Sequence, residues 1–587
     1  MNRKLLLYVA LIAVAAGAPY LLGPKASDDA STAVAHAQSD SAAAAKPAAT
    51  KPTGSAPSAP LTAASLAAAP VARIESNELQ VSVTSLNGGF LSARLKSERF
   101  RDKGVQTDLV STDKPAYLPF AVELEGVTGD GTPYALEPAA DNTVRLRKVI
   151  DGIEVVRKVE AGGPYQMWLT TRLSNQGTSV RKVRLSVATH RWVTRDEEGK
   201  PVFFLPVQSP GISSGLCRHD GELEREHRDA LAPPLTFGGS VQFTGVASVF
   251  FLSALAPEHS ADVEHCSIQA DDRPLPGDQA LGSLFSSRLA HRSVELKPGD
   301  TRTYKTLAYL GPKSREELLT AGHGLKEAIE SGWFSSLADG LTWLLRKIND
   351  NVGNWGLAII LLTFLVKTAL FPLTAKQMQS MAKMKELKPE MDRINELYAD
   401  DREKKGAAVM ELYRKRGVNP MAGCFPVLLQ LPIWFSLYAS LSSNVELLHA
   451  PFMLWWTDLS SPDPFFVLPL LLGILMFVQQ KMSPATAMDP IQQKMMLYMM
   501  PIMMTSFMLF LPAGLCLYTL TNSALSIGQQ RLIEARLARI VPPTPSADVV
   551  TSGTDDDDDD DEPSSTSERL RLNRPSKAER RAHRGKR

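Results

Sequence analysis

The feature that most constrains this chain is Lys367, the only formal charge inside a helix-length apolar run from Trp355 to Phe371. A run of this length is typical of a helix that crosses a bilayer, and a charge placed there is costly enough to require a reason. Side chains three, four or seven residues apart share one helical face, so Lys367 forms a polar stripe with Thr363 and Thr374. Two interpretations stay open. The ammonium is a functional charge within the membrane, or it reaches the headgroups from the end of the span.

Apolar residues are unevenly distributed along the chain. After one N-terminal apolar run, residues 1–330 read as a soluble region, whereas 352–533 hold several apolar stretches of about bilayer-spanning length. The overall hydrophobic content of 44% and net charge of +1 conceal this segregation. The sequence therefore predicts a polytopic α-helical membrane protein that carries a large soluble domain.

The N-terminus has basic residues followed by an apolar run over 5–22, which is typical of a signal peptide or a retained anchor. Small residues that resemble a cleavage site, Ala35 to Ala37, lie well downstream of this run. We therefore expect an uncleaved N-terminal transmembrane anchor over 1–23. Residues 24–72 are mostly Ala, Pro, Ser and Thr, which predicts a disordered linker.

From 73 to 325 the apolar residues follow a period of two, as in Leu79, Val81 and Val83. Alternation of this kind is typical of strands that are buried on one face. Turn sequences such as Asn87-Gly88-Gly89 separate the alternating segments. We expect an exported all-β sandwich over 73–325.

Histidines and cysteines in this region raise the question of a metal or acid/base site. Seven of the ten histidines fall there, and six of them lie among the predicted strands and loops between residues 190 and 291, namely His190, His219, His227, His259, His265 and His291. Their spacing repeats no two-ligand unit of the kind found in zinc sites, which favours scattered histidines and no cofactor. Pairing of Cys217 with Cys266 in an exported compartment stays open.

Residues 331–350 have an amphipathic helical pattern. Apolar positions such as Leu337, Leu341 and Leu345 fall on one face, and the charged residues lie elsewhere. We interpret this segment as a helix that lies in the membrane interface. A helix that closes the β domain has the same periodicity and is the alternative.

The distribution of Lys and Arg in the short loops predicts an orientation. Residues 376–416 contain eleven Lys or Arg and eight Asp or Glu, whereas 442–463 contain no Lys or Arg. We therefore place 376–416 in the cytoplasm, as a helical hairpin interrupted by Pro389 and Gly406. Both termini are then cytoplasmic and the β domain is exported. The insertion core, 352–533, has five expected spans, near 352–371, 421–441, 464–480, 495–511 and 513–533.

Several short motifs in the second half of the chain resemble one family. They are Asn419 to Pro426, Gln430 to Trp434, Gln480 to Pro484 and Leu511 to Leu515, together with the charged segment Lys376 to Tyr413. They resemble the YidC/Oxa/Alb family of membrane protein insertases, over about 331–540. The resemblance is looser over the β domain, which in bacterial members is a β-supersandwich similar to sugar-binding mutarotase-like folds.

The resemblance implies five clustered helices around a hydrophilic groove with one positive residue at its centre. The groove is open to the cytoplasm and to lipid, and closed on the outer side. Lys367 matches the position of the positive residue, but the family usually has arginine there. A mechanism that needs a bidentate guanidinium contact is therefore in doubt for this chain.

We expect six polar residues to line the groove: Thr363, Lys367, Gln430, Thr505, Tyr518 and Asn522. For Gln430, Thr505 and Asn522 the alternative to lining a groove is hydrogen bonding between helices, as is common in membrane bundles. The resemblance implies a non-enzymatic insertase and chaperone of the bacterial inner membrane. It acts on nascent membrane proteins, alone or with the Sec translocase, and in contact with membrane lipid.

The C-terminal segment 534–587 has two charge blocks, seven aspartates from Asp555 to Asp561 and nine Lys or Arg between 569 and 587. Such blocks are typical of disordered tails. The basic end suits the phosphates of ribosomal RNA or of anionic lipid, and related insertases hold ribosomes through basic tails. A solvated tail in which the acidic block shields the basic one is the alternative.

Two other classes of function stay open. A secondary transporter would use Lys367 to bind an anionic substrate, and it predicts internal repeats, of which we find none that is convincing. An envelope carbohydrate-binding protein would use the β domain and need the helices only as an anchor. Deletion of 73–325 separates the readings, because only the insertase is expected to keep most of its activity.

Overall fold

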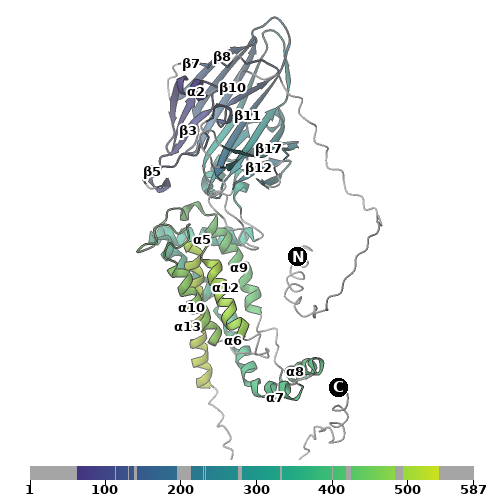
Figure 1. The fold of residues 1–587 in the computed structure, drawn as a ribbon, viewed down its shortest axis with the longest axis vertical. Helices are drawn as coiled ribbons and strands as arrows, with labels where there is room; N and C mark the ends of the chain where they lie inside the picture. Colours follow the sequence, from purple (N-terminus) through teal and green to yellow (C-terminus); the bar gives the residue numbers. More distant parts are fainter. Residues whose placement is uncertain are drawn as a thin grey trace, which may run out of the picture.

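The computed structural model describes residues 63–540, apart from 103, 113, 130, 138–141, 195–212, 229–230, 232, 275–280, 331–333, 399–400, 418–424 and 483–493. The predicted anchor, most of the linker, the tail beyond 540 and part of the Asn419 to Pro426 motif lie outside the described residues. The chain forms a β domain and a helical C-terminal core, stacked one above the other (Figure 1).

Strands of the β domain run from Val71 to Pro312 and pair antiparallel throughout. A nine-stranded sheet has the order β13 (Glu222–His227), β12 (Ser214–His219), β15 (Val241–Ala247), β16 (Phe251–Pro257), β20 (Thr301–Pro312), β10 (Gln166–Asn175), β9 (Ile153–Ala161), β8 (Thr143–Ile150) and β7 (Ala135–Glu137). The six-stranded sheet has the order β14 (Leu235–Gly238), β17 (Val263–Pro274), β18 (Leu281–His291), β11 (Arg181–Thr194) and β19 (Val294–Leu296), with β6 (Val122–Glu125) paired to β11.

Smaller sheets are formed by β1 (Val71–Glu75), β2 (Leu79–Thr84) and β3 (Phe90–Leu95), and by β4 (Arg101–Asp102) and β5 (Val105–Gln106). The predicted alternation is visible in β2, where Leu79, Val81 and Val83 are buried. Inward side chains of the large sheets, such as Val246 and Leu289, join one hydrophobic core. The structure therefore confirms the β-sandwich and the helical C-terminal core.

The start of the β domain differs from the prediction. We expected a disordered linker up to residue 72, but the structure has a short helix, α2 (Ala63–Ala68), and β1 begins at Val71. The backbone of β1 pairs with β2 over its whole length, and Ile74 is fully buried. Pairing with a neighbouring strand supplies order that the composition of this segment alone does not.

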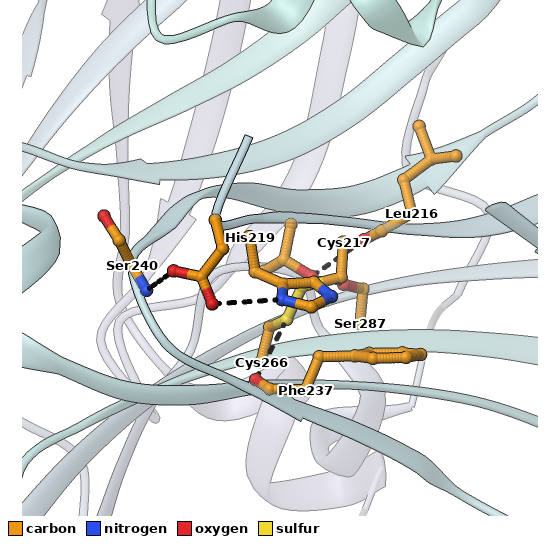
Figure 2. The surroundings of a disulfide bond; sticks show 9 residues. Leu216, Cys217, His219, Phe237, Ser240, Cys266 and Ser287 are labelled. Carbon is orange, nitrogen blue, oxygen red and sulfur yellow. Dashed lines mark hydrogen bonds and ion pairs between the residues drawn. A yellow bond between two sulfur atoms is a disulfide. The ribbon is translucent and has the colours of Figure 1, made fainter. Parts of the chain in front are cut away.

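A disulfide links the two large sheets. Cys217 on β12 pairs with Cys266 on β17, with the two Cα atoms 6.4 Å apart (Figure 2). Both cysteines are buried, and the ring of His219 stacks on Phe237 beside them (Figure 2). The pairing that the sequence left open is therefore made. Within the described residues, no group of three or more His, Cys, Asp or Glu is placed to hold a metal ion.

After the β domain, the short helix α4 (Arg315–Ala321) leads to the helical core. The core contains α5 (Ser335–Val352), α6 (Trp355–Glu386), α7 (Lys388–Leu397), α8 (Arg402–Arg416), α9 (Phe425–Ser442), α10 (Val467–Met482), α12 (Met500–Met508) and α13 (Ala513–Ile540). A π-helical turn, Met495–Met499, precedes α12. Helix α5 lies across the end of the bundle next to the β domain, and α7 and α8 lie at the opposite end (Figure 1).

Two helices differ from their predicted ends. We expected the first span to end near 371 and a separate hairpin to begin at 376, but α6 continues through Pro372 to Glu386. A proline removes one backbone donor, and a helix in a bundle tolerates that loss. Gly406 was expected to interrupt the hairpin, yet it lies inside α8. One glycine costs a helix only about 1 kcal/mol relative to alanine, which flanking residues offset.

The apolar face of α5 packs on the helical core. Its buried residues Leu341 and Leu345 share a hydrophobic cluster with residues of α6 and α9, such as Leu362 and Leu437. The alternative, in which this helix closes the β domain, is therefore wrong. Within the described residues, one helical segment, Trp355–Lys376, has both the length and the hydropathy of a membrane span. The apolar helices Val467–Met482 and Met495–Met508 are shorter.

Candidate functional site

The candidate site is a polar stripe along α13. Tyr518, Asn522, Ser526 and Gln529 are spaced by four, four and three residues, so they share one helical face. Lys367 of α6 and Gln430 of α9 contact this face, and both helices pack beside α13, as does α10. We call these four residues, with Lys367 and Gln430, the α13 stripe.

Lys367 contacts α13 directly. Its ammonium donates a hydrogen bond to Ser526 Oγ at 2.8 Å, and Ser526 Oγ in turn donates to the backbone oxygen of Asn522 at 2.7 Å. The Gln529 side-chain amide donates to the backbone oxygen of Lys367 at 3.4 Å. The lysine is half-buried, and α6 continues beyond it to Glu386. The ammonium therefore lies between two helices and not at the end of one.

The charge of Lys367 has no carboxylate partner among the described residues, and its hydrogen-bond acceptor is a neutral hydroxyl. A fixed cation between helices, where the effective dielectric is lower than in water, attracts a carboxylate more strongly than it would in solvent. Close by, Gln529 Oε1 is buried and has no hydrogen-bond partner in the described part of the chain. The site thus combines an unneutralised charge with unused hydrogen-bonding capacity.

Gln430 and Tyr518 form a second contact along the same stripe. The Gln430 side-chain amide donates to the Tyr518 hydroxyl at 3.0 Å, and Tyr518 is buried. Tyr518 lies eight residues before Ser526 on α13, a rise of about 12 Å. Asn522 lies between the two levels and is half-buried. The stripe therefore extends over at least two turns of helix.

Two of the expected groove residues make other contacts. Thr363 is buried, and its hydroxyl donates to the backbone oxygen of Ile359 within α6. Thr505 lies on α12 against α10, where a Cβ added to Gly473 would come within 2.3 Å of Thr505 Oγ1. The structure thus brings Lys367, Gln430, Tyr518 and Asn522 to the stripe. It places Thr505 at a close contact between α10 and α12.

Sequence reasoning missed Ser526 and Gln529. The signal was available, because both continue the spacing that relates Tyr518 to Asn522. What the sequence lacked was the position of α6, from which Lys367 reaches a residue 159 positions later in the chain. Apolar side chains are exposed on the outer faces of the helical core, including Phe364 and Leu365 on α6 and Ile474 on α10.

Two family models match the chain. The model described as 60Kd inner membrane protein matches residues 347–539, and the model of the YidC periplasmic domain matches 72–344. The protein named membrane protein insertase YidC from Anaeromyxobacter sp. (strain K) is 35% identical over 489 residues, which cover 78% of this chain and 84% of that protein. Its namesake from Aeromonas salmonicida (strain A449) is 35% identical over 488 residues, covering 79% and 86%.

A solved structure described as an active YidC insertase, with its first transmembrane domain resolved, is also similar. It is 17% identical, with a TM-score of 0.35, and the match covers 79% of this chain and 95% of that one. A TM-score of this size supports no conclusion about the fold.

Proposed function

The chain belongs to the YidC family of membrane protein insertases, and we propose that the α13 stripe is the surface along which it inserts its clients. The family is one of inner membrane proteins with a periplasmic domain, and it is not a family of enzymes. The observation that carries the proposal is the ammonium of Lys367, which is held against α13 by Ser526 and has no carboxylate beside it in the part of the chain that the structure describes.

In this mechanism, Lys367 attracts an acidic residue near the exported end of a client. The polar groups of the stripe, Gln430, Tyr518, Asn522 and Gln529, hydrate part of the bilayer's thickness, so that a hydrophilic segment crosses a thinner apolar barrier. The client's apolar segment then moves into lipid past the exposed side chains of the outer faces. Burial of about twenty apolar residues in the bilayer supplies the driving force.

A lysine suffices for this role. The attraction between an ammonium and a carboxylate needs no bidentate geometry, and the one hydrogen bond to Ser526 leaves two ammonium protons for other acceptors. Thr505, which packs against α10, then contributes to the packing of α10 on α12. The hydroxyl of Thr363 makes its hydrogen bond within α6.

The topology that fits this mechanism has an N-terminal anchor over 1–23 and five spans. They comprise the apolar parts of α6, α9, α10 and α13, together with the segment Met495–Met508. Both termini, α7 and α8 are cytoplasmic, and the β domain is periplasmic. Support comes from the Lys and Arg of 376–416, which belong to the end of the bundle that is opposite the β domain (Figure 1).

The proposed partners are nascent membrane proteins, membrane lipid, the Sec translocase and, through the basic tail, the ribosome. The tail carries nine Lys or Arg between 569 and 587, enough to bind several phosphates. We expect deletion of 563–587 to weaken co-sedimentation with ribosomes. The co-sedimentation that remains should be less sensitive to salt. Unchanged co-sedimentation would remove the ribosome from the list.

The test is insertion of a single-span client with an acidic exported tail into proteoliposomes that contain the full chain. Lys367→Ala is expected to reduce insertion at least tenfold, since it removes the one charge of the site. Lys367→Arg is expected to retain it. Ser526→Ala keeps the ammonium and removes only its hydrogen bond, so its effect should be small.

Lys376→Ala is the matched control, because Lys376 lies on the same helix and is exposed. A client with a neutral exported tail should lose its dependence on Lys367. Full activity of Lys367→Ala with the acidic client would contradict the charge mechanism and leave hydration of the stripe to carry insertion. Absence of insertion by the wild type would favour the transporter.

A further inference from the structure

A cavity of about 820 Å³ lies where the β domain meets the helical core. Its wall includes Arg99 and Lys313 from the β domain, Trp343 and Arg346 from α5, and Ser443 just after α9. Contacts hold the two regions together at this point. Arg99 Nη2 donates to the backbone oxygen of Val445 at 2.8 Å, and Arg346 binds Glu446 at 2.6 Å. The volume is within the range of pockets that bind small molecules.

The carboxylates of the cavity wall already have cationic partners. The pairs are Arg346 with Glu316 at 3.1 Å and with Glu446 at 2.6 Å, Arg225 with Glu330 at 2.7 Å, Arg315 with Asp339, and Lys347 with Asp350 at 3.6 Å. The residues of these ion pairs therefore need no charged ligand.

Two cations of the wall remain without a carboxylate. Lys313 is 4% exposed, and its ammonium makes no hydrogen bond or ion pair with the described residues. Arg99 is exposed, and its guanidinium donates to the Val445 carbonyl and lies over the ring of Phe100. It forms no ion pair with the described residues, although Glu446 is close enough to oppose the lowering of its pKa by burial. A buried charge without a partner is costly unless an anion or ordered solvent compensates it. The wall as a whole carries five Lys or Arg and five Asp or Glu, so its charges balance in number, but Lys313 and Arg99 lie outside its ion pairs.

Burial lowers the pKa of Lys313 to about 8, with a smaller opposing effect from Glu330 and a smaller reinforcing effect from Arg225. The ammonium is thus still mostly protonated at neutral pH. An anion in the cavity would stabilise the charged form and raise this pKa again.

The surroundings of the cavity are those of a membrane interface. On α5, Trp343 is 61% exposed, and Trp355 at the start of α6 also lines the cavity. The segment after α9 exposes Leu454 and Phe465, and it is tied to this end of the bundle by a hydrogen bond from the Asn354 amide to the Phe452 carbonyl. Tryptophan and other aromatic side chains gather at the depth of lipid headgroups.

We propose that this cavity binds the phosphate of an anionic phospholipid headgroup, with Lys313 and Arg99 as its cationic contacts and Trp343 at its rim. The lipid comes from the periplasmic leaflet, a detail that rests on the proposed topology. The bound headgroup compensates the buried charge of Lys313 and fastens the β domain to α5 and the membrane surface.

The test is native mass spectrometry of the full-length protein in detergent, titrated with phosphatidylglycerol or with phosphatidylcholine. Lys313→Met and Arg99→Gln are each expected to weaken phosphatidylglycerol binding about fivefold. Lys313→Arg should retain it. Lys297→Met, on the exposed surface of the β domain, is the matched control and should leave it unchanged.

Inorganic phosphate is the second arm, because it offers the same chemistry without a lipid. We expect millimolar phosphate to compete only weakly, since it lacks the acyl chains that hold the headgroup at the rim. Full displacement by phosphate would overturn the lipid as the source of the anion. The site itself would be overturned if the two variants lost phosphatidylcholine binding to the same extent as phosphatidylglycerol binding. Unchanged phosphatidylglycerol binding in both variants would also overturn it.

Lys313 is buried, so Lys313→Met is checked by thermal unfolding, and Arg99→Gln, at an exposed position, carries the test if the first variant does not fold. The measurement involves no insertion, and failure of the insertion assay with Lys367→Ala leaves this result unaffected.

Discussion

The β domain and the helical core place apolar side chains in opposite ways. The large exposed apolar residues of the strands are isolated, such as Val105 and Val149, while their apolar partners fill one continuous core. By contrast, α6 alone exposes Leu357, Leu361, Phe364, Leu365 and Leu373. The helical core is folded for contact with lipid and the β domain for contact with water.

The interiors hold different polar features. The β domain buries a disulfide between Cys217 and Cys266 and a histidine, His190, whose ring bonds to Ser286 Oγ. Both regions bury hydroxyls, in the helical core those of Thr363, Thr519 and Ser523, but the helical core also directs the half-buried Lys367 of α6 toward α13. In a bilayer, polar groups are stable only where other protein groups or water reach them, which is the interior of the bundle.

The largest expected difference concerns the disulfide, which joins residues 49 positions apart. The double variant Cys217→Ser with Cys266→Ser should lower the stability of the β domain by about 4 kcal/mol, because the unfolded chain loses a closed loop. The helical core has a buried free cysteine, Cys516, and should be unaffected. Calorimetry with and without reductant measures both transitions. If the unfolding transition of the helical core shifted by the same amount, the two regions would not be independent in stability.

A charge placed on each outer surface tests which solvent that surface meets. Phe364 is 57% exposed and Val149 is 51% exposed, so they are closely matched. Phe364→Lys should cost about 3 kcal/mol if its side chain faces the middle of a bilayer. Val149→Lys should cost about 0.5 kcal/mol or less if its side chain faces water. Thermal unfolding in lipid nanodiscs compares the two, and equal costs would refute the contrast.

Acid should destabilise the β domain selectively. Burial lowers the pKa of His190 to about 3, whereas the unfolded residue titrates near its ordinary value of 6.5. The folded state therefore binds fewer protons in this window, and stability falls as pH falls from about 6.5 toward 3. At about pH 5 the loss is roughly 2 kcal/mol. His291, whose pKa burial lowers to about 4, adds to it.

Hydrogen exchange of peptides from β11, which carries His190, reads this effect locally. His190→Gln should reduce the loss of protection between about pH 7 and pH 5, after correction for the intrinsic exchange rate. Peptides from α13, which has no histidine, should show no such change. Equal loss of protection in α13 would mean that the two regions unfold together.

The smallest expected effect compares one substitution in both interiors. Tyr518 accepts a hydrogen bond from Gln430 in the helical core, and Tyr309 donates one to the Pro312 carbonyl in the β domain at 2.7 Å. Tyr309→Phe should cost about 1 kcal/mol, because it leaves a buried carbonyl unpaired. Tyr518→Phe should cost about 0.6 kcal/mol. Thermal unfolding of both variants is the measurement, and a larger cost at Tyr518 would reverse the order.

Local periodicity was enough to predict much of this molecule. Alternation in segments such as Leu79 to Val83 predicted the strands, and the apolar run around Lys367 predicted the longest apolar helix. The failures lie at boundaries and contacts. Pro372 did not end α6, and β1 ordered part of the expected linker. In each case contacts with another element decided whether a weak local preference held.

Hydrophobic pattern and segment length predicted the strands of a water-exposed region and the helices of a lipid-exposed one, because both signals depend only on neighbouring residues. The contacts of Lys367 with Ser526 and of Cys217 with Cys266, and the cavity that Lys313 and Arg99 share, follow from tertiary packing alone. These pairs come from distant segments, and their meeting depends on how whole helices and sheets pack, which no local pattern specifies.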